Sequence, residues 1–242
     1  MKIVVSEFNT PTFNLAAEEY LFSKSGEDYL LLYINEPSVI IGSNQAVLNE
    51  VDLDFCIDNS ILVIRRLSGG GAVYHDKGNF NYSLIHDKTE APLSAQFLEP
   101  MVEVLKRLSI NAEIGKRKDL WLEGFKISGT ASHISKGREL HHGTLLYDTN
   151  HEMLWGALSS RNRELIQKAT QSVVSPVVNI RNYIVSKNGY APDADEFFDK
   201  FINELAGYYN LDEVETFDNK DLIEIEKIQK SKYTNRDWNY RK

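Results

Sequence analysis

Two adjacent arginines and three consecutive glycines make up the stretch of this sequence best suited to binding chemistry. Arg65 and Arg66 follow the apolar run 61–64, which we interpret as a buried strand, and residues 69–71 are all glycine. Because glycine has no Cβ atom, its backbone can approach a ligand closely and adopt a positive φ at little steric cost. Fixed positive charge beside such a turn suits the anionic end of a ligand.

The residues that follow the glycines extend this pattern. Residues 72–74 read as a second strand, and residues 79–84 alternate polar with apolar side chains, which is the period of a strand. Phe80, Tyr82 and Leu84 are expected to enter a core, while the opposite face carries hydrogen-bonding groups. A strand, a charged glycine turn and a polar-faced strand together predict a pocket for an elongated ligand with an anionic end.

A simpler interpretation stays open at this point. Three glycines can form a loose loop, and two arginines can end a solvated strand. The stretch lacks the Lys-Ser/Thr pair that closes a P-loop, and no strand–GxGxxG–helix pattern can be written through it. The spacing alone therefore leaves a ligand site and a loose loop as alternatives.

The elements before the glycines have to position them. A short helix capped by Asn14 is expected to end before Gly26. Two apolar runs, 29–34 and 39–41, are separated by turn-forming residues 35–38, and this arrangement predicts a hairpin.

The rest of the chain mixes both kinds of element. Helix patterns occur around residues 53–57, in a stripe that begins near Pro100, and from Glu152 onward, most clearly from Phe197 to Tyr208. A last helix is expected at 220–232, with Leu222, Ile225 and Ile228 facing inward. Strands are expected at 119–122, 125–134 and 139–147. Helices before, between and after strands predict an α/β or α+β domain.

The composition excludes several classes of protein. Lys and Arg number 27 and Asp and Glu 35, so the net charge is 27 − 35 = −8, which disfavours nucleic-acid binding. A single cysteine, Cys56, excludes an internal disulfide and a multi-cysteine metal site. The first residues are no signal peptide, and no apolar run is long enough to span a membrane, so we expect a cytoplasmic protein without a membrane partner.

The glycine stretch resembles the signature of a known family. Arg-Arg-x-Ser-Gly-Gly-Gly-Ala-Val-Tyr-His-Asp, followed by Gly-Asn-x-Asn, is similar to the motif of lipoate–protein ligase A and its relatives. The resemblance covers essentially the whole chain, because it continues through residues 14–19, 41–45, 126–131, 140–146 and 238–240. It implies the biotin/lipoate-ligase fold, which is class II synthetase-like: an α/β (α+β) domain with a mixed, largely antiparallel sheet flanked by helices. It also implies a single catalytic domain over residues 1–242, without the C-terminal accessory domain of the full-length bacterial ligase.

Lys126 is the residue whose interpretation the resemblance changes most. On pattern alone, a solvated lysine on a strand is favoured, with Lys126, Ser128 and Thr130 on one face. In the ligase family the lysine before Ile/Val-Ser-Gly contacts the carboxylate and α-phosphate of the bound acyl-adenylate. The resemblance therefore implies that Lys126 is catalytic and neutralises the charge that builds up in adenylation and transfer.

The resemblance also implies a set of residues that bind the substrate and its adenylate. Arg66 is favoured over Arg65, which lies on the opposite side of the strand and is interpreted as structural. A histidine bonded to a backbone carbonyl remains the alternative for His75. His141 and His142 point to opposite faces of a strand and cannot readily share one metal, and no zinc site is expected; His142 is taken as the pocket-facing member. The predicted set is Arg66, Ser68, Gly69, Gly70, Gly71, His75, Asn79, Ser128, Gly129, His142 and Gly143.

The implied cofactors are ATP and Mg²⁺, with lipoate as the substrate. Asp119 matches the aspartate of a family Asn-Asp-Leu element and is a candidate magnesium ligand, although Lys118 replaces the asparagine. Ser43 and Pro176 stand where many ligases have arginine. Losing two cations near a triphosphate is expected to weaken the use of ATP more than the binding of a finished adenylate.

The implied reaction converts lipoate and ATP to lipoyl-AMP and then transfers the lipoyl group to a lysine. The implied acceptors are lipoyl domains of 2-oxoacid dehydrogenase complexes and the glycine-cleavage H protein. The nearest alternative is a transferase that uses lipoyl-AMP made elsewhere, with a separate accessory or activating protein. An octanoyltransferase, which uses a cysteine nucleophile, is disfavoured because Cys56 lies in a predicted helix as a buried, inert thiol. A biotin ligase and a non-catalytic lipoate-binding subunit are the remaining alternatives.

Overall fold

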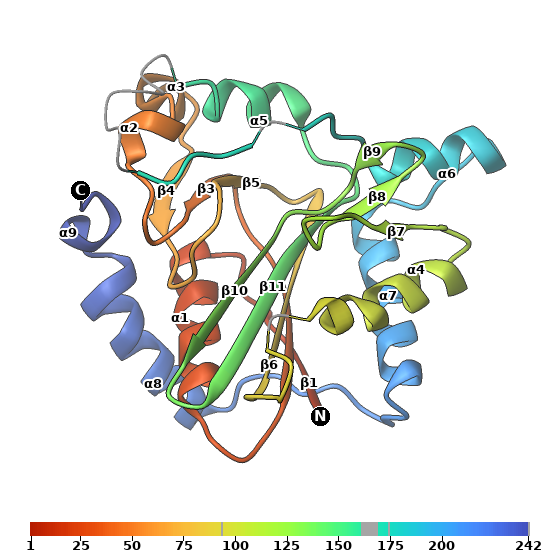
Figure 1. Cartoon of the computed structure of the whole chain (residues 1–242), viewed down its shortest axis with the longest axis horizontal. Coiled ribbons are helices and arrows are strands. Elements are labelled where there is room, and N and C mark those ends of the chain that lie inside the picture. The colour runs from red at the N-terminus through yellow and green to blue at the C-terminus, as the bar shows by residue number, and fades with distance from the viewer. Residues whose placement is uncertain (93, 161–168, 174, 242) are drawn as a thin grey trace.

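The computed structural model describes residues 1–92, 94–160, 169–173 and 175–241. Its central element is a five-stranded sheet in the order β1 (Lys2–Val5), β2 (Tyr29–Ile34), β6 (Asn79–Asp87), β11 (Arg138–Leu146) and β10 (Thr130–Ser135). Strands β1 and β2 are parallel, and the other neighbours are antiparallel. The mixed, largely antiparallel sheet between helices confirms the predicted fold class (Figure 1).

The alternation predicted for residues 79–84 is present in β6. Phe80, Tyr82 and Leu84 pack into the core beneath α4 (Glu99–Arg107) and α7 (Ala194–Tyr208). On the opposite face, Ser83 donates a hydrogen bond to a carboxylate on α1 (Pro11–Ser23). The sheet thus has one apolar face and one face that carries polar groups toward α1.

A second sheet holds the glycine stretch, in the order β4 (Leu62–Arg65), β3 (Ser38–Ile41) and β5 (Val73–His75). The predicted hairpin between residues 29–34 and 39–41 is wrong, because β2 pairs with β1 and β6 whereas β3 pairs with β4 and β5. The buried side chain of Asn35 bonds to those of Asn14 and His75, and these contacts direct the chain from one sheet into the other.

A third, small sheet comprises β7 (Glu113–Ile114), β8 (Leu120–Leu122) and β9 (Phe125–Lys126). The single strand predicted over residues 125–134 is divided, since β9 ends at Lys126 and β10 begins at Thr130. Between them the Ile127 amide donates to the Leu120 carbonyl, and the Thr144 amide donates to the Gly129 carbonyl. Lys126, Ser128 and Thr130 therefore do not form one regular strand face.

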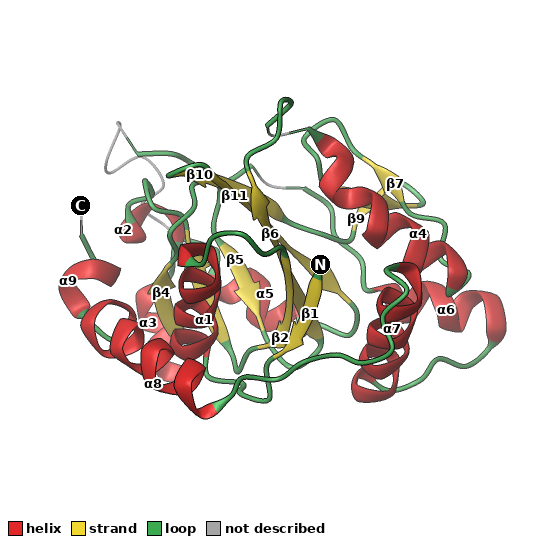
Figure 2. Ribbon diagram, turned by 90° about the horizontal axis from the view of Figure 1, so that it is seen from below, coloured by secondary structure: helices red, strands yellow, loops and turns green. Residues whose placement is uncertain are grey.

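Helices cover both sides of the large sheet (Figure 2). One side carries α1, α8 (Asn219–Ile228), the π-helical turn η2 (Gln229–Tyr233) and α9 (Arg236–Asn239), with Leu222, Ile225 and Ile228 packed inward as predicted. The other side carries the 3-10 turn η1 (Ala95–Leu98), α4 and α7. The small β4–β3–β5 sheet packs against α3 (Leu53–Asp58) and α5 (His151–Ala157), with α2 (Val47–Glu50) at its edge, and α6 (Ile180–Asn188) precedes α7.

Two expectations about helix starts have different outcomes. Pro100 lies in the first turn of α4, as predicted. Asn14 is not a cap, because α1 begins at Pro11 and Asn14 is fully buried within it. Its amide donates to the Phe8 and Ile34 carbonyls, so it ties the helix to β2 instead. No helix in the described parts of the chain is both long and apolar enough to cross a membrane.

Candidate functional site

A cleft with two connected chambers lies between the α1-facing side of the large sheet and the β4–β3–β5 sheet. The first, here called the loop chamber, has a volume of about 320 Å³ and reaches from the glycines to Leu15 and Tyr33. The second, here called the Trp155 chamber, has a volume of about 200 Å³ and lies between β5, α5 and the end of β11. Lys126 lines both chambers and therefore stands where they meet.

The Arg66 side chain holds the glycine loop by hydrogen bonds. Its Nε donates to Ser68 Oγ at 3.0 Å and its Nη1 to the Ile40 carbonyl at 2.9 Å. Its Nη2 donates to the carbonyls of Gly69, at 2.5 Å, and Gly71, at 2.8 Å. Four of the five N–H groups of Arg66 thus donate to protein atoms. The fifth, on Nη1, has no acceptor among the described residues and is available to a ligand.

The loop is also held in place by neighbouring backbone. Gly70 has a φ of +85°, a left-handed conformation that favours glycine. A Cβ atom on Gly42 would collide with the Gly70 carbonyl, so the two backbones touch directly. Arg65 is fully buried on the other side of β4 and donates to the carbonyls of Gly42, Gln45 and Trp238, which fits the structural role expected of it.

A chain of buried polar side chains connects the loop to α1. Ser68 Oγ lies 2.7 Å from His142 Nε2, and His142 Nδ1 lies 2.7 Å from Glu18 Oε2, which also accepts from Ser83 at 2.5 Å. Because a carboxylate can only accept, His142 Nδ1 donates to Glu18. Ser68 Oγ accepts from Arg66 Nε and contacts His142 Nε2 on its other side. Buried hydrogen bonds, here called the relay, therefore run without a break from Arg66 to Glu18.

Glu18 balances the charge of Arg66 across this relay. Burial alone raises the pKa of the Glu18 carboxyl, but its interactions with His142 and Ser83 outweigh burial and lower that pKa below its usual value. Burial likewise lowers the pKa of Arg66 to about 10, which leaves it charged at neutral pH. Glu18 was not predicted as a site residue, although a glutamate one turn after Asn14, among the apolar residues of α1, was a signal that could have found it.

His75 presents an unused donor to the loop chamber. Asn35 accepts from Asn14 through its carbonyl oxygen and so donates its amide to His75 Nδ1 at 2.9 Å. The proton of His75 is therefore on Nε2, which has no hydrogen-bond partner among the described residues. Burial, followed by the nearby Arg66, lowers the pKa of His75 to about 3. A neutral histidine that donates to a ligand fits this geometry, and its partner is the Asn35 side chain instead of a backbone carbonyl.

Lys126 is paired with Asp119 at the junction of the chambers. Lys126 Nζ lies 3.1 Å from Asp119 Oδ2, and the indole of Trp121 donates to Asp119 Oδ1 at 2.8 Å. The Lys126 amide donates to the Pro176 carbonyl at 2.9 Å, so the segment around Pro176 holds the backbone of Lys126 in place. Arg117, a half-exposed residue of the loop chamber, stands beside this pair, 4.0 Å from Asp119, and donates to Ser175 Oγ at 2.9 Å.

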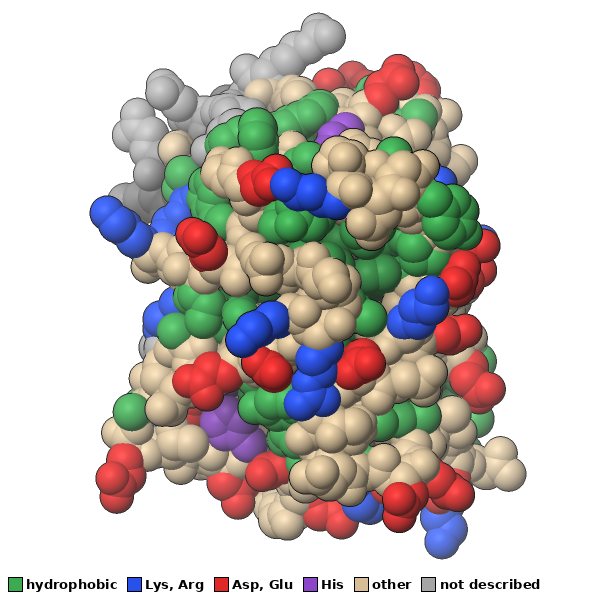
Figure 3. All heavy atoms as spheres, turned by 90° about the vertical axis from the view of Figure 1, so that its right-hand side faces the viewer, with side chains coloured by type: hydrophobic (Ala, Val, Ile, Leu, Met, Phe, Trp, Pro, Cys, Tyr) green, Lys and Arg blue, Asp and Glu red, His purple; other side chains and the backbone are tan. Residues whose placement is uncertain are grey.

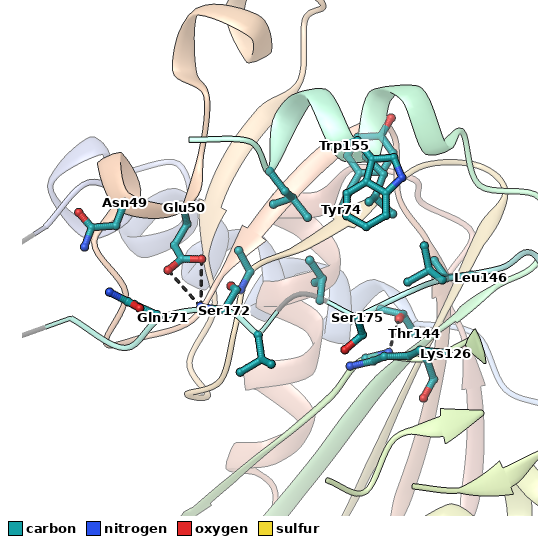
Figure 4. A pocket seen from close by; sticks show the side chains of 18 residues that line it. Asn49, Glu50, Tyr74, Lys126, Thr144, Leu146, Trp155, Gln171, Ser172 and Ser175 are labelled. Atoms are coloured by element: carbon teal, nitrogen blue, oxygen red, sulfur yellow. Dashed lines mark hydrogen bonds between the residues drawn. The ribbon is translucent and has the colours of Figure 1, made fainter. Parts of the chain in front are cut away.

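Aromatic and apolar side chains form the wall of the Trp155 chamber (Figure 4). Trp155 and Tyr74 lie together on one side, and Lys126 and Thr144 lie across from them. At the far end, both Glu50 carboxylate oxygens are 3.2 Å from the Ser172 amide. An apolar chamber with polar groups at its ends suits a flat heteroaromatic ring.

Residues 171–173 line both chambers, Thr170 lines the loop chamber, and none of them was predicted as part of the site. Ser172 Oγ accepts from the Ala72 amide at 2.9 Å and from Gln45 Nε2 at 3.1 Å. The Thr170 amide donates to the Asn44 carbonyl at 3.3 Å. No local pattern indicates these contacts, because they join segments more than 90 residues apart.

Comparison with known proteins shows which family this chain belongs to. Residues 10–206 match the family described as the lipoyl protein ligase A/B catalytic domain. The chain belongs to this family. It is 37% identical over 238 residues to the lipoate-protein ligase LplJ of Bacillus subtilis (strain 168), with 96% of this chain and 71% of the relative covered.

Two solved structures of ligases have the same fold. A bi-partite lipoate protein ligase of Thermoplasma acidophilum, studied with its E2 lipoyl domain, is 26% identical, with a TM-score of 0.80 over 99% of this chain and 96% of that one. A lipoate-protein ligase A bound with ATP is 25% identical, with a TM-score of 0.81 over 99% of this chain and 98% of that one. The expected resemblance to lipoate–protein ligases is confirmed.

The structure distributes the residues predicted from the ligase family as follows. Arg66, Gly70, Gly71, His75, His142, Gly143 and Asp119 line the loop chamber, Ser128 lines the Trp155 chamber, and Gly129 and Lys126 line both. Ser68 and Gly69 lie behind the lining and act on it through Arg66 and His142. Asn79 is fully buried outside both chambers and donates to Asn81, which lines the loop chamber in its place.

Cys56 lies outside the cleft of this ligase-family chain. It is buried in α3, against the core of the small sheet, as predicted. Burial, followed by the nearby Asp52 carboxylate, raises the pKa of the thiol to about 11, which disfavours the reactive thiolate. Its position and protonation both argue against a thioester mechanism.

Proposed function

We propose that this chain activates lipoate with ATP to form lipoyl-AMP and transfers the lipoyl group to a lysine of an acceptor protein. The observation that carries the proposal is the position of Lys126, the cation at the junction of an elongated chamber and a chamber walled by Tyr74 and Trp155. The loop chamber would take the lipoyl chain, and the Trp155 chamber would take the adenine ring. The acyl–phosphate bond then falls at Lys126.

In the first half-reaction, a carboxylate oxygen of lipoate attacks the α-phosphorus of ATP, and pyrophosphate leaves with the electron pair of the broken P–O bond. Negative charge concentrates at the α-phosphate, where a positioned cation lowers the barrier most. Lys126 is held ready by Asp119 at 3.1 Å and would turn from that carboxylate to the phosphate. Arg117, which lines the loop chamber, is placed to meet the leaving pyrophosphate.

In the second half-reaction, the neutral amine of the acceptor lysine attacks the acyl carbon. The C–O bond to AMP breaks, and AMP leaves with its electron pair, whose negative charge Lys126 would neutralise. The amine gives up a proton to water. The donor N–H groups of His75 and Arg66 would hold the adenylate, and the enclosed cleft would keep water from the anhydride. Positioning and charge neutralisation supply most of the rate in this account.

Mg²⁺ is proposed to enter with the nucleotide. Asp119 lines the loop chamber, and among the described residues its Oδ2 atom has no partner besides the Lys126 and Arg117 ion pairs. This carboxylate could serve an ion that takes its other ligands from phosphates and water. When bound, Mg²⁺ would neutralise charge on the triphosphate. Asp119 can serve it only after Lys126 has moved away.

The second candidate function is a transferase that depends on lipoyl-AMP made elsewhere. It is favoured by the few cations in the cleft, since Arg66, Arg117 and Lys126 are the only lysines or arginines among the described lining residues. The Pro176 carbonyl is used by the Lys126 amide, and Ser43 likewise carries no charge. Stabilising a leaving pyrophosphate needs more positive charge than holding a finished adenylate.

The initial rate of acceptor lipoylation, measured by intact mass with each donor, separates these two functions. We expect modification with both donors, faster from preformed lipoyl-AMP than from lipoate and MgATP. Transfer from lipoyl-AMP with no modification from lipoate and MgATP would favour the transferase. Equal rates with both donors and no added protein would show a self-sufficient ligase.

We propose further that residues 1–242 act as one catalytic domain. The proposed acceptors are lipoyl domains of 2-oxoacid dehydrogenase complexes and the glycine-cleavage H protein, by analogy with the Thermoplasma ligase and its E2 lipoyl domain. The proposed location is the cytoplasm, where ATP is available to the reaction.

A further inference from the structure

A cluster of two histidines and a glutamate lies on the far face of the large sheet from the catalytic cleft. Glu139 on β11 is directly opposite His86 on β6, and His141 is opposite Leu84. Because strand side chains alternate, His86, Glu139 and His141 share the face that packs against η1, α4 and α7, while His142 points to the cleft. One ligand atom from each of the three lies within 4.8 Å of the others.

Each of these side chains is held by a hydrogen bond on its other atom. His86 Nδ1 donates to the Asp87 carbonyl at 2.8 Å, so its Nε2 carries a lone pair, and this Nε2 has no partner among the described residues. His141 Nδ1 lies 2.8 Å from the Ser132 hydroxyl. Glu139 Oε1 accepts from the amide and hydroxyl of Thr89 at 2.8 and 3.2 Å. Partners of this kind orient metal ligands. His141 Nε2 donates to Glu139 Oε2 in this structure, so a metal would displace that proton, and the Ser132 hydroxyl could then accept from Nδ1.

The Glu139 carboxylate is buried without a permanent cation. It is 1% exposed, and His141 Nε2, at 3.0 Å from Oε2, is its ion-pair candidate. No lysine or arginine pairs with it in the described parts of the chain. A buried carboxylate is costly unless it is paired or bound to a metal.

The cluster is open to solvent on one side. It lines a cavity of about 830 Å³ whose other walls include Glu27, Asp28, Asp87 and Glu99, against one basic side chain, Lys2. Acidic side chains also gather along the lower edge of the face shown in Figure 3. Negative charge around an opening raises the local concentration of cations.

We propose that His86, Glu139 and His141 bind a divalent transition metal such as Zn²⁺, with water from the cavity as the fourth ligand. Two imidazoles and one carboxylate suit zinc better than magnesium or calcium, which prefer oxygen ligands. Ligands about 2.0–2.1 Å from a tetrahedral zinc lie roughly 3.4 Å apart. The contact between Glu139 and His141 is already close to that spacing, and the ligand atom of the half-buried His86, within 4.8 Å of the other two, has to move closer when the ion binds.

The bound metal would join β6 to β11 behind the cleft. These strands carry Asn81 and His142 on their opposite faces, so the metal would brace the floor of the site without touching the substrate. The site would therefore change the stability of the protein more than its chemistry.

The test uses the full chain without a histidine tag, stripped of metal and titrated with ZnCl₂ in a calorimeter. We expect one zinc per chain and a rise of roughly 5–10 °C in Tm at a hundredfold excess over Kd. Co²⁺ should give the visible absorption of a tetrahedral ion. His86→Ala, at a half-buried position, and Glu139→Gln should each weaken binding by at least ~100-fold.

His151→Ala is the matched control, since His151 lies near the cleft and bonds to Asn179. It should bind zinc as the unmodified chain does. The proposal is overturned if the unmodified chain binds no zinc, or if His86→Ala binds it equally well. Loss of zinc from His151→Ala with retention in His86→Ala would place the metal elsewhere and overturn it too.

Discussion

Gly70 and Gly69 are adjacent glycines that should respond oppositely to the same substitution. An alanine at Gly70 must adopt a φ of +85°, which costs about 1–2 kcal/mol for a residue with a Cβ atom. That Cβ would also lie 3.0 Å from Arg66 Nη2 and 3.3 Å from Ala131 Cβ. Strain and crowding together reach about 1–3 kcal/mol, which corresponds to a roughly 5- to 150-fold loss in affinity if the ligand needs the native loop.

Gly69→Ala is the control, because a Cβ atom at Gly69 meets nothing within 4 Å and its φ is ordinary. The assay is calorimetric binding of lipoate and of a non-hydrolysable lipoyl-AMP analogue to both variants, with circular dichroism to verify folding. Gly70→Ala should bind weakly and Gly70→Val should not bind, whereas Gly69→Ala should bind within about twofold of the unmodified chain. Equal affinities for Gly70→Ala and Gly69→Ala would refute the account of the loop as a ligand cradle.

Three further predictions concern the charges of the cleft and the Cys56 thiol outside it. Glu18→Gln keeps the shape of the relay but removes the charge that balances Arg66, so we expect a loss of about 1.5–3 kcal/mol in the free energy of unfolding and weaker lipoate binding; denaturant titration that detects no loss would contradict this role. His75 has a pKa of about 3 when folded and of about 6.5 when unfolded, so the unfolded chain binds more protons between these values and stability falls as pH falls through this window. At pH 5 the loss should be about 2 kcal/mol, and His75→Gln, which cannot titrate, should show a shallower dependence in unfolding curves from pH 7 to pH 5. Cys56→Ser should leave the rate of acceptor lipoylation unchanged, and a folded but inactive variant would restore the thioester mechanism.

The local sequence was sufficient where one element carries the whole signal. The alternation of Phe80, Tyr82 and Leu84 predicted the faces of β6, and the stripe from Phe197 to Tyr208 predicted α7. The glycines at 69–71, with their arginines, indicated the loop that the structure places over the cleft. In each case the burial pattern of one strand or helix is written in consecutive residues.

What the sequence could not predict depends on contacts between distant segments. Asn35 read as a turn residue, but its side chain bonds to Asn14 and His75, and so β2 and β3 belong to different sheets. The strand predicted over 125–134 divides because Ile127 and Gly129 pair with Leu120 and Thr144. Pairing partners of this kind are chosen by the tertiary fold.

The relay and the metal cluster have the same origin. Glu18 meets His142 across 124 positions of sequence, and its role appears only once α1 lies against β11. The two neighbouring histidines, His141 and His142, pointed to opposite faces as expected. The sequence could not show that His86 joins Glu139 and His141, because the strand register that sets His86 beside Glu139 is not visible in either segment alone.

The most direct test of the account is the lipoylation rate of Lys126→Ala. The variant and Lys116→Ala, an exposed neighbouring lysine outside both chambers, are incubated with preformed lipoyl-AMP and a lipoyl-domain acceptor, and intact acceptor mass is followed over time. Removing a positioned charge costs on the order of a hundredfold in rate, so Lys126→Ala should be at least ~100-fold slower while still folding, with a Tm lowered by the loss of its ion pair with the buried Asp119. Lys116→Ala should match the unmodified chain. Near-normal modification by folded Lys126→Ala would remove this lysine from the mechanism and contradict the account of the cleft.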